Sequence, residues 1–292
     1  MKLIATDLDG TLLNEKSEVS SKNILAIRKA QESGIEVVIA TGRSYEAAKK
    51  PLMEAGLSCP IICVNGSLVY LKSGEIIRTI PLDKESCRKI QLACESEHMY
   101  FEIYTSNGGY SVNRDKFIHV LINMMKSHFP NVETDVLKER IQQRFQDEKI
   151  QATDDFDVIF NNPNIDVYKF LAFSLEDVTL HRVREQLKDE QDLAITSSGH
   201  LNLEINHRDA NKGAALSFYA NRLGIELEDV MALGDNFNDY SMLEIAGFSV
   251  AMENADPAIK ELCDFTTKKN SEHGVAFAIE KVLEGEFSKQ TF

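Results

Sequence analysis

The sequence lacks the features of a membrane-bound or secreted chain. It has no run of about eighteen consecutive apolar residues, so we expect no membrane-spanning helix. Its N-terminus has no basic region followed by an apolar stretch, so we also expect no signal peptide. These absences favour a cytoplasmic protein with no membrane partner.

Cysteines are few, and they do not form a recognisable framework. There are five, an odd number, and no Cys-x-x-Cys pair occurs. Several lie in apolar segments, as is typical of buried, reduced thiols in a cytoplasmic protein. Cys59 and Cys63 flank a predicted strand, which argues against a zinc site there.

Basic residues are outnumbered by acidic ones. The chain has 32 Lys and Arg against 46 Asp and Glu, a formal net charge of -14. This balance argues against a nucleic-acid partner or an anionic membrane surface. A phosphate-bearing ligand would therefore need locally placed cations, among which a metal ion is the obvious one. The length of 292 residues and the 43% hydrophobic content predict one large globular domain or two.

The most informative stretch is Asp7-Leu8-Asp9-Gly10-Thr11-Leu12. It follows a short apolar run that predicts a buried parallel strand, and Gly10 allows a sharp turn. The strand would present Asp7 and Asp9 at its C-terminal tip, the edge at which open α/β sheets bind ligands. Two acids one residue apart suit a nucleophile with a general acid, and also a divalent cation. For this stretch alone, an ordinary Asp-Gly turn is the alternative.

The rest of the chain predicts an α/β fold with an insertion. Strands and helices alternate at both ends of the chain, which predicts right-handed crossovers and a parallel sheet. The middle changes to hairpins and amphipathic helices, with a polar segment at 115–150 that we expect to be helical with interruptions. We predict a Rossmann-like, doubly wound parallel-sheet core formed by residues 1–82 and 207–292, with an inserted α+β domain at 83–206.

Four predicted strand ends and one helix start carry polar residues that this topology would bring to one edge. They are Asp7 and Asp9, Thr41-Gly42, Asn65-Gly66, the group Asp235, Asn238 and Asp239, and Lys212. Two carboxylates 4 Å apart repel by about 4 kcal/mol at an effective dielectric constant of 20. Three or four together would raise one another's pKa or need a cation. Oxygen ligands without a His or Cys cluster favour Mg²⁺ over zinc.

This constellation suits phosphoryl transfer through an aspartyl-phosphate. Asp7 would attack phosphorus, and Asp9 would protonate the leaving alcohol and later activate water. Lys212, the Thr41 hydroxyl and the backbone N–H groups near Leu8 and Gly42 would hold the phosphate.

Four ordered motifs carry a family resemblance. Asp7-Leu8-Asp9-Gly10-Thr11-Leu12, Thr41-Gly42-Arg43, Asn211-Lys212-Gly213 and Gly234-Asp235-Asn236-Phe237-Asn238-Asp239 resemble those of the haloacid dehalogenase-like phosphatases. The insert resembles the large α/β (type IIB) cap of their Cof-type branch. Asn65-Gly66 and Ala251-Met252-Glu253-Asn254-Ala255 also fit that branch. The resemblance spans nearly the whole chain, although the middle of the insert matches only in outline.

The resemblance implies a role for each matching position. Asp7 is the expected nucleophile and a magnesium ligand, and Asp9 is the acid/base, which binds metal through its carbonyl oxygen. Asp235 is the third protein ligand of the metal, and Asp239 supports Lys212 or the metal shell. The implied phosphate contacts are Leu8, Thr41, Gly42, Lys212 and Asn238. Arg43, Asn65 and Asn254 are further members of the expected site.

The expected activity is Mg²⁺-dependent hydrolysis of a small phosphorylated metabolite, either a sugar phosphate or a cofactor-type phosphate. A phosphosugar mutase of the same fold and a non-catalytic sensor of phosphorylated metabolites stay as alternatives. A receiver-type signalling domain also uses acids and a lysine, but it has no need of the large insert. No exposed apolar stripe stands out, so we expect a monomer or a weak homodimer.

Several polar side chains of the insert are candidates for a substrate pocket. A single His or Tyr is more often structural, so none of them is assigned. They are Tyr104, Arg114, His119, His128, Tyr168, Lys169 and His200.

Overall fold

The computed structural model describes residues 1–292 except 113–117, 119–120, 124–125, 127–131, 200 and 288–292. The chain divides into a core unit, Met1–Thr79 with Ala210–Phe292, and a cap unit, Ile80–Asp209. The sequence predicted boundaries at residues 82 and 206. The candidates Arg114, His119, His128 and His200 lie outside the described residues.

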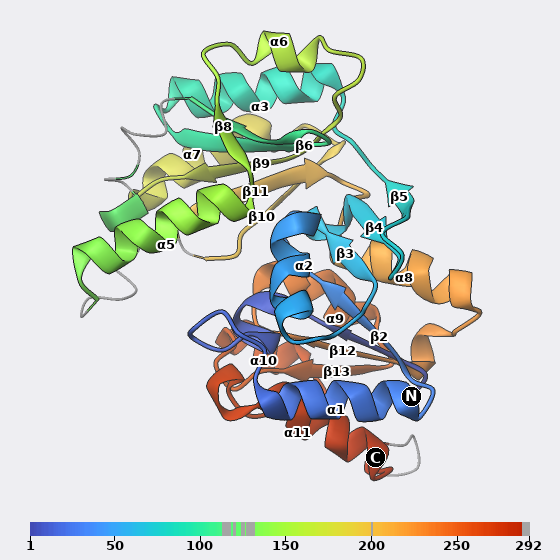
Figure 1. The fold of residues 1–292 in the computed structure, drawn as a ribbon. Helices are drawn as coiled ribbons and strands as arrows, with labels where there is room; N and C mark the ends of the chain where they lie inside the picture. The colour runs from blue at the N-terminus through green and yellow to red at the C-terminus, as the bar shows by residue number, and fades with distance from the viewer. Residues whose placement is uncertain (113–117, 119–120, 124–125, 127–131, 200, 288–292) are drawn as a thin grey trace. The chain divides into compact units, whose positions relative to one another are not determined.

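A mostly parallel sheet forms the centre of the core unit (Figure 1). Its strands follow the order β14-β13-β12-β1-β2-β3-β4-β5. All pairs from β14 to β3 are parallel, whereas β4 and β5 add an antiparallel edge. The predicted doubly wound sheet is therefore confirmed. The strands are β1 Leu3–Thr6, β2 Glu36–Ala40, β3 Ile61–Cys63, β4 Leu68–Tyr70, β5 Ile76–Thr79, β12 Val230–Gly234, β13 Phe248–Ala251 and β14 Phe265–Thr266.

Strand β1 lies between β12 and β2, and every one of its residues is buried. A parallel strand covered on both faces has no solvent side, which explains its continuous apolar run. Its position in the middle of the sheet places the residue that follows it, Asp7, between two neighbouring strand ends.

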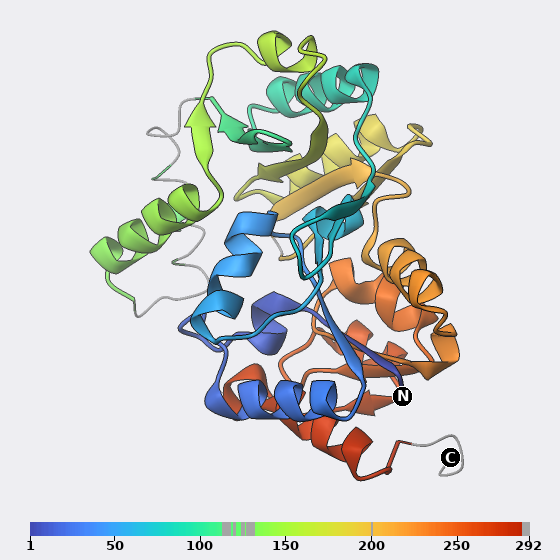
Figure 2. The ribbon, with the colours of Figure 1, turned by 45° about the vertical axis from the view of Figure 1, so that its right-hand side comes forward.

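Helices cover the core sheet, and α1 and α11 pack side by side along one face (Figures 1 and 2). The start of α8 is set by Asn211, whose Oδ1 accepts the Ala214 backbone N–H at 2.7 Å. This cap fixes the first residue of the helix, Lys212. The helices are α1 Ser21–Glu32, α2 Tyr45–Glu54, α8 Lys212–Leu223, α9 Tyr240–Ile245, α10 Pro257–Leu262 and α11 Gly274–Leu283.

The cap unit contains a second sheet, with strand order β10-β11-β9-β6-β7-β8. It is antiparallel except for the parallel pair β7 and β8. The strands are β6 Tyr100–Thr105, β7 Gly108–Ser111, β8 Ile150–Ala152, β9 Val167–Phe173, β10 Leu193–Thr196 and β11 Asn202–His207, and the helices are α3 Lys84–Ser96, α5 Thr134–Asp147, α6 Asp157–Phe160 and α7 Asp177–Leu187.

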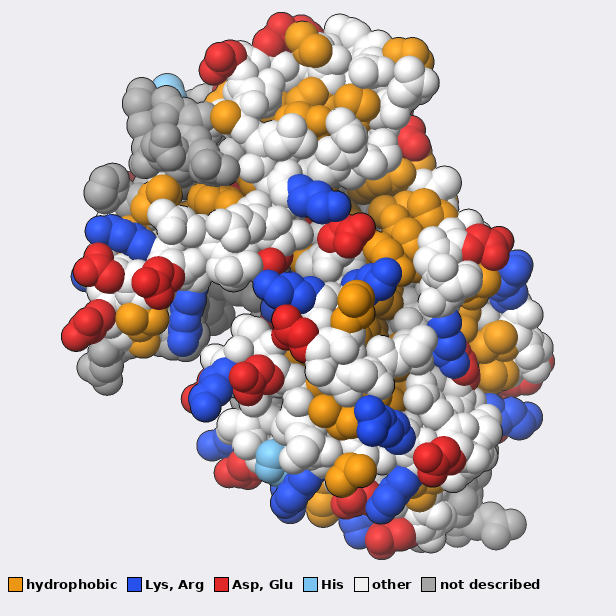
Figure 3. Space-filling view, in the orientation of Figure 1, with side chains coloured by type: hydrophobic (Ala, Val, Ile, Leu, Met, Phe, Trp, Pro, Cys, Tyr) orange, Lys and Arg blue, Asp and Glu red, His pale blue; other side chains and the backbone are white. Residues whose placement is uncertain are grey.

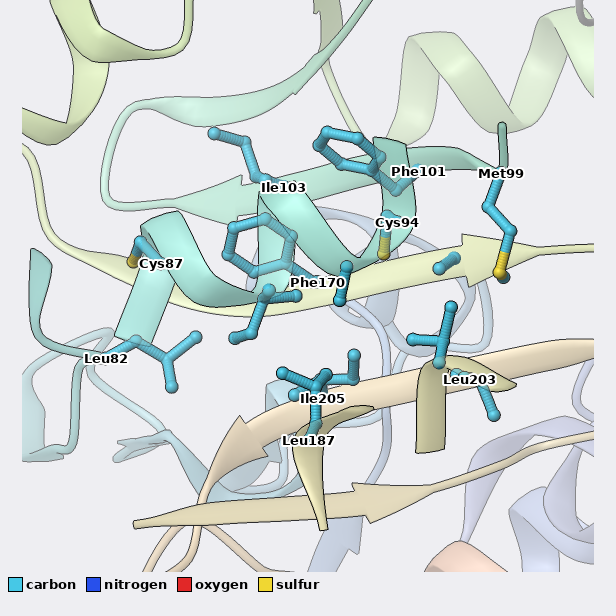
Figure 4. Close-up of a cluster of buried hydrophobic side chains, with 14 of the residues drawn as sticks. Leu82, Cys87, Cys94, Met99, Phe101, Ile103, Phe170, Leu187, Leu203 and Ile205 are labelled. Atoms are coloured by element: carbon cyan, nitrogen blue, oxygen red, sulfur yellow. The ribbon is translucent and has the colours of Figure 1, made fainter. Parts of the chain in front are cut away.

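One face of the cap sheet packs against α3 and α7 around an apolar cluster (Figure 4). Alternate residues of the strands supply it, such as Phe101 and Ile103 of β6 and Phe170 of β9. Within the polar segment 115–150, the structure has α5 and the start of β8. The sequence predicted neither β8 nor the single-turn α6, because elements of three or four residues carry too little periodicity to be recognised.

Charged side chains of both signs lie on the surface of the core unit. On the face shown in Figure 3, acidic and basic side chains are interspersed over the core unit and do not form separate patches. No helix in the described part of the chain is long and apolar enough to cross a membrane.

Candidate active site

The carboxyl ends of neighbouring parallel strands bring the predicted polar residues together. In the sheet register, Thr6 of β1 is opposite Leu233 of β12 and Ile39 of β2. The residues that follow these strands therefore meet at one edge of the sheet. The Asp7 backbone N–H donates to Leu233 at 2.9 Å, which ties the first turn after β1 to the neighbouring strand.

Lys212 is the centre of this site. Its side chain is fully buried, and its Nζ lies 2.6 Å from Asp7 Oδ1 and 2.5 Å from Asp239 Oδ1. One oxygen from each of Asp7, Asp235 and Asp239 lies within 4.8 Å of the others. Three carboxylates thus share a small volume with the ammonium group of one lysine.

The pKa shifts reflect this crowding. Burial, and next the Asp239 carboxylate, raises the pKa of Asp7 well above its usual range, and Lys212 opposes the shift. Burial and the Asp239 carboxylate likewise raise the pKa of Asp235 to about 7. Burial lowers the pKa of Lys212, but Asp239 and Asp7 outweigh it, so the net shift is upward and the amine stays charged. A cation or a proton is therefore needed to balance the cluster.

Asp239 is held in place by the loop that carries it. Its Oδ2 accepts the backbone N–H groups of Asp235 at 2.9 Å and Asn236 at 3.1 Å. Its other oxygen, Oδ1, contacts Lys212. Since both oxygens have partners, Asp239 anchors Lys212 and shapes the Asp235 turn. The supporting role expected for Asp239 stays a prediction.

The Asp9 carboxylate contacts Arg43 and lies at the surface. Arg43 donates to it from Nε at 2.7 Å and from Nη2 at 2.5 Å, in a bidentate ion pair. The Asp9 side chain is 55% exposed, whereas that of Asp7 is 6% exposed. The two acids of the motif therefore occupy different environments. The link to Arg43 was not foreseen, because only the fold brings residues 9 and 43 together.

The predicted phosphate-binding positions surround the same edge. Thr41 is buried, and its hydroxyl oxygen accepts the Arg43 backbone N–H at 3.2 Å. Asn65 is also buried, and its backbone N–H donates to the Thr41 carbonyl at 3.0 Å. Asn238 is half-buried in the single turn Phe237–Asp239 that follows Asp235, and Leu8 is fully buried.

Two contributors were not assigned from the sequence. Thr11 Oγ1 donates to Asp235 Oδ1 at 2.8 Å, so the turn after Asp7 is bonded to the acid after β12. Asn270 contacts both Asn254 and the end of this turn. Thr11 lies within the quoted motif and was recognisable from it, whereas Asn270 has no sequence signal.

The donor set fits a hard divalent cation. The clustered groups are carboxylates, and burial, together with the neighbouring Asp239 carboxylate, raises the pKa of Asp235. Hard cations prefer such oxygen ligands, whereas zinc in proteins usually takes nitrogen and sulfur. The fold and the site together define an α/β enzyme with an acidic strand-edge centre and an inserted second unit.

Comparison with known proteins agrees with this class. Residues 4–279 match the family model described as haloacid dehalogenase-like hydrolase. The 5-amino-6-(5-phospho-D-ribitylamino)uracil phosphatase YwtE of Bacillus subtilis is 38% identical over 289 residues, which cover 99% of this chain and 100% of that protein. The pyridoxal phosphate phosphatase YbhA of Escherichia coli is 28% identical, over 94% of this chain and 96% of that protein.

A solved structure shows the same architecture. A haloacid dehalogenase-like hydrolase from B. subtilis superposes with a TM-score of 0.88 and 36% identity, over 96% of this chain and 99% of that one. The chain therefore belongs to the haloacid dehalogenase-like hydrolase family, in its Cof-type branch. The family resemblance of the four ordered motifs is confirmed.

Proposed function

We propose that this protein hydrolyses a small phosphorylated metabolite with the help of Mg²⁺, through an aspartyl-phosphate on Asp7. Its relatives in the family are named phosphatases, which makes it a phosphoric monoester hydrolase. The observation that carries the finer proposal is the buried contact of Lys212 with Asp7, beside two further carboxylates. A lysine neutralises charge at the attacking oxygen and offers N–H donors to a phosphate.

Asp7 is the proposed nucleophile. Its side chain is nearly buried, and Lys212 holds one of its oxygens at 2.6 Å, so the carboxylate has a fixed direction. An Asp7 oxygen attacks phosphorus, and the bond from phosphorus to the leaving oxygen breaks. Lys212, the Thr41 hydroxyl, Asn238 and the backbone N–H groups of Leu8 and Gly42 are the proposed contacts for the phosphoryl oxygens.

Asp9 is the proposed acid and base. It gives its proton to the leaving alcohol, then takes a proton from the water that attacks the aspartyl-phosphate. This second step releases inorganic phosphate and restores Asp7. The bidentate contact with Arg43 competes for the same carboxylate, so Asp9 must exchange this partner during turnover. Arg43 is thus placed to hold Asp9 between reaction cycles.

Asp7 and Asp235 would hold the metal, together with the Asp9 carbonyl oxygen. The all-oxygen donors and the nearness of the carboxylates support Mg²⁺. When bound, the ion supplies charge neutralisation between the carboxylates and the phosphate. Asp239 is the less suitable ligand, because its oxygens already serve Lys212 and two backbone N–H groups.

The proposed substrate is a sugar phosphate or a cofactor-type phosphate. The two named relatives act, by their names, on a phosphoribityl-aminouracil and on pyridoxal phosphate. Both are small phosphate monoesters that include a heteroaromatic ring. Such compounds therefore belong in the first substrate panel beside simple sugar phosphates.

The test is phosphate release from this panel, with Mg²⁺ and with EDTA, for the wild type and Asp7→Asn. Release that needs both Mg²⁺ and Asp7 is the expected result. Isomerisation of a phosphosugar without phosphate release would instead favour a mutase. Tight binding of a panel member without turnover would favour a sensor, although a sensor has no need of a nucleophile.

A further inference from the structure

The turn that follows Asp7 is held from outside by asparagine side chains. Three carboxamides, which we call the asparagine brace, each donate from Nδ2 to a backbone carbonyl of this turn. The pairs are Asn254 with Gly10 at 2.8 Å, Asn23 with Leu12 at 3.1 Å and Asn270 with Leu13 at 2.9 Å.

Two members of the brace are themselves held at the other end of the carboxamide. Asn254 Oδ1 accepts the Asn270 backbone N–H at 2.9 Å. Asn23 Oδ1 accepts the Ala276 backbone N–H at 3.0 Å. Each of these carboxamides thus donates to a carbonyl and accepts from an N–H, which fixes its orientation. The brace therefore connects the turn to the segment around residue 270 and to α11.

The turn needs such support because its backbone is unusual. Gly10 has a φ of 77°, and a Cβ there would lie 2.4 Å from Asp235 Oδ2. Thr11 donates to the same carboxylate. The turn is therefore bonded to Asp235 on one side and to Asn254 on the other. Asp9 precedes Gly10 directly, so the direction of the Gly10 carbonyl constrains where the Asp9 backbone and side chain lie.

The three asparagines of the brace differ in burial, so their loss should affect stability to different extents. Asn23, a residue of α1, is fully buried and bonded to α11, so its loss would leave buried polar groups without partners and lower stability. Asn254 is exposed, and Asn270 is partly so. A hydrogen bond from an exposed side chain adds little to the free energy of unfolding, because water replaces it.

We infer that Asn254 and Asn270 are positioning residues that align Asp9 through the Gly10 and Leu13 carbonyls. The inference rests on the proposed role of Asp9 as acid and base. A general acid must lie within hydrogen-bond reach of the leaving oxygen, and a misplacement of about 1 Å lowers the rate by about 100-fold. The brace keeps the turn from relaxing when Asp9 leaves Arg43.

The experiment compares two phosphate esters in Asn254→Ala. The first is the best alkyl phosphate of the panel, whose alkoxide must be protonated as it leaves. The second is p-nitrophenyl phosphate, whose phenolate leaves without a proton. The kcat/KM value covers the steps up to loss of the leaving group. We expect it to fall about tenfold or more for the alkyl ester and by less than about threefold for the aryl ester.

Asn270→Ala is the second variant, and it removes the bond to Leu13 while keeping the backbone N–H that Asn254 accepts. We expect the same preference for the aryl ester. Asn221→Ala, an exposed asparagine of α8, is the matched control and should leave both values unchanged. Thermal unfolding should give equal midpoints for Asn254→Ala and Asn221→Ala.

An equal loss for the two esters, no loss in either brace variant, or an unfolded Asn254→Ala protein would overturn the inference. None of these outcomes contradicts the proposed function, as long as the wild type releases phosphate with Mg²⁺ and the Asp7→Asn variant does not. If the wild type released no phosphate, that result would instead contradict the proposed function itself.

Discussion

Both units bury charged side chains, but they arrange them in opposite ways. In the core unit, Asp7, Asp235 and Asp239 lie within 4.8 Å of one another. Lys212 contacts Asp7 and Asp239, whereas Asp235 accepts a hydrogen bond from the uncharged Thr11. The core site therefore holds like charges together.

In the cap unit, the buried charges of the sheet face partners of opposite sign. Glu102 of β6 accepts a bidentate pair from Arg144 of α5 and a further bond from the Tyr104 hydroxyl. Glu204 of β11 lies 4.0 Å from Lys169 of β9. Glu102 is thus hydrogen-bonded to its cation, and Glu204 has a lysine within ion-pair distance.

This difference in charge arrangement distinguishes the functional cluster of the core unit from the structural network of the cap unit. A buried ion pair with its hydrogen bonds made needs no further counter-charge, whereas clustered carboxylates raise one another's pKa and call for a cation. Perturbed acids at a sheet edge are accordingly candidates for chemistry. The following predictions test whether the two regions differ in this way.

The largest effect is expected for Asp7→Asn in the core unit. Removing the nucleophile should lower kcat for phosphate release by about 10⁴-fold or more, because no aspartyl-phosphate can form. Phosphate release under saturating substrate measures it. Asp229→Asn, on the surface of the same unit, is the control and should keep full activity. A variant with a tenth of the wild-type rate would exclude Asp7 as nucleophile.

Arg144→Ala should produce the opposite pattern in the cap unit. It leaves the fully buried Glu102 without its cation, and we expect a loss of about 2–4 kcal/mol in the free energy of unfolding. The lower part of this range applies because the Arg144 side chain is 32% exposed. Urea unfolding measures the loss. If stability held and kcat/KM collapsed, Arg144 would belong to the substrate site.

The core cluster should make the metal-free protein sensitive to pH. An acid whose pKa is raised by folding binds its proton more tightly in the folded state, so ionisation favours unfolding. With a pKa of about 7 for Asp235 against 3.8 in the unfolded chain, the free energy of unfolding in EDTA should fall as pH rises from 4 to 7. The expected loss is on the order of 2 kcal/mol.

Urea unfolding in EDTA across this pH range measures the loss, and Asp235→Asn should make the profile shallower, with the remaining slope due to Asp7. Added Mg²⁺ should stabilise the wild type more above pH 7 than below pH 5, because protons and metal compete for the carboxylates. An EDTA profile that rises through the same window would contradict the charge crowding inferred here.

The smallest effect is expected for an exposed ion pair of the cap. Arg88 lies 3.0 Å from Asp157, with side chains 44% and 61% exposed. Water already solvates both groups, so Arg88→Ala should cost less than about 1 kcal/mol in urea unfolding. A loss as large as that of Arg144→Ala would show that burial is not what distinguishes the cap network.

The sequence by itself predicted the parallel core and most of the residues at its edge. Strand periodicity and the turn residues after each strand are local signals, and parallel pairing requires their carboxyl ends to meet. Asp7, Thr41, Asn65 and Asp235 were therefore assignable to one edge from the sequence alone. The residue roles stay predictions until the variants are measured.

Only the tertiary structure decided the contacts between distant segments. Three contacts join residues that are 34 or more positions apart. They are Asp9 with Arg43, Asp7 with the buried Lys212, and Gly10 with Asn254. No periodic pattern encodes such contacts, because they depend on how strands and loops meet in space. Strand β8 was not predicted for the same reason, because its three residues form a strand by pairing with β7 and carry no pattern of their own.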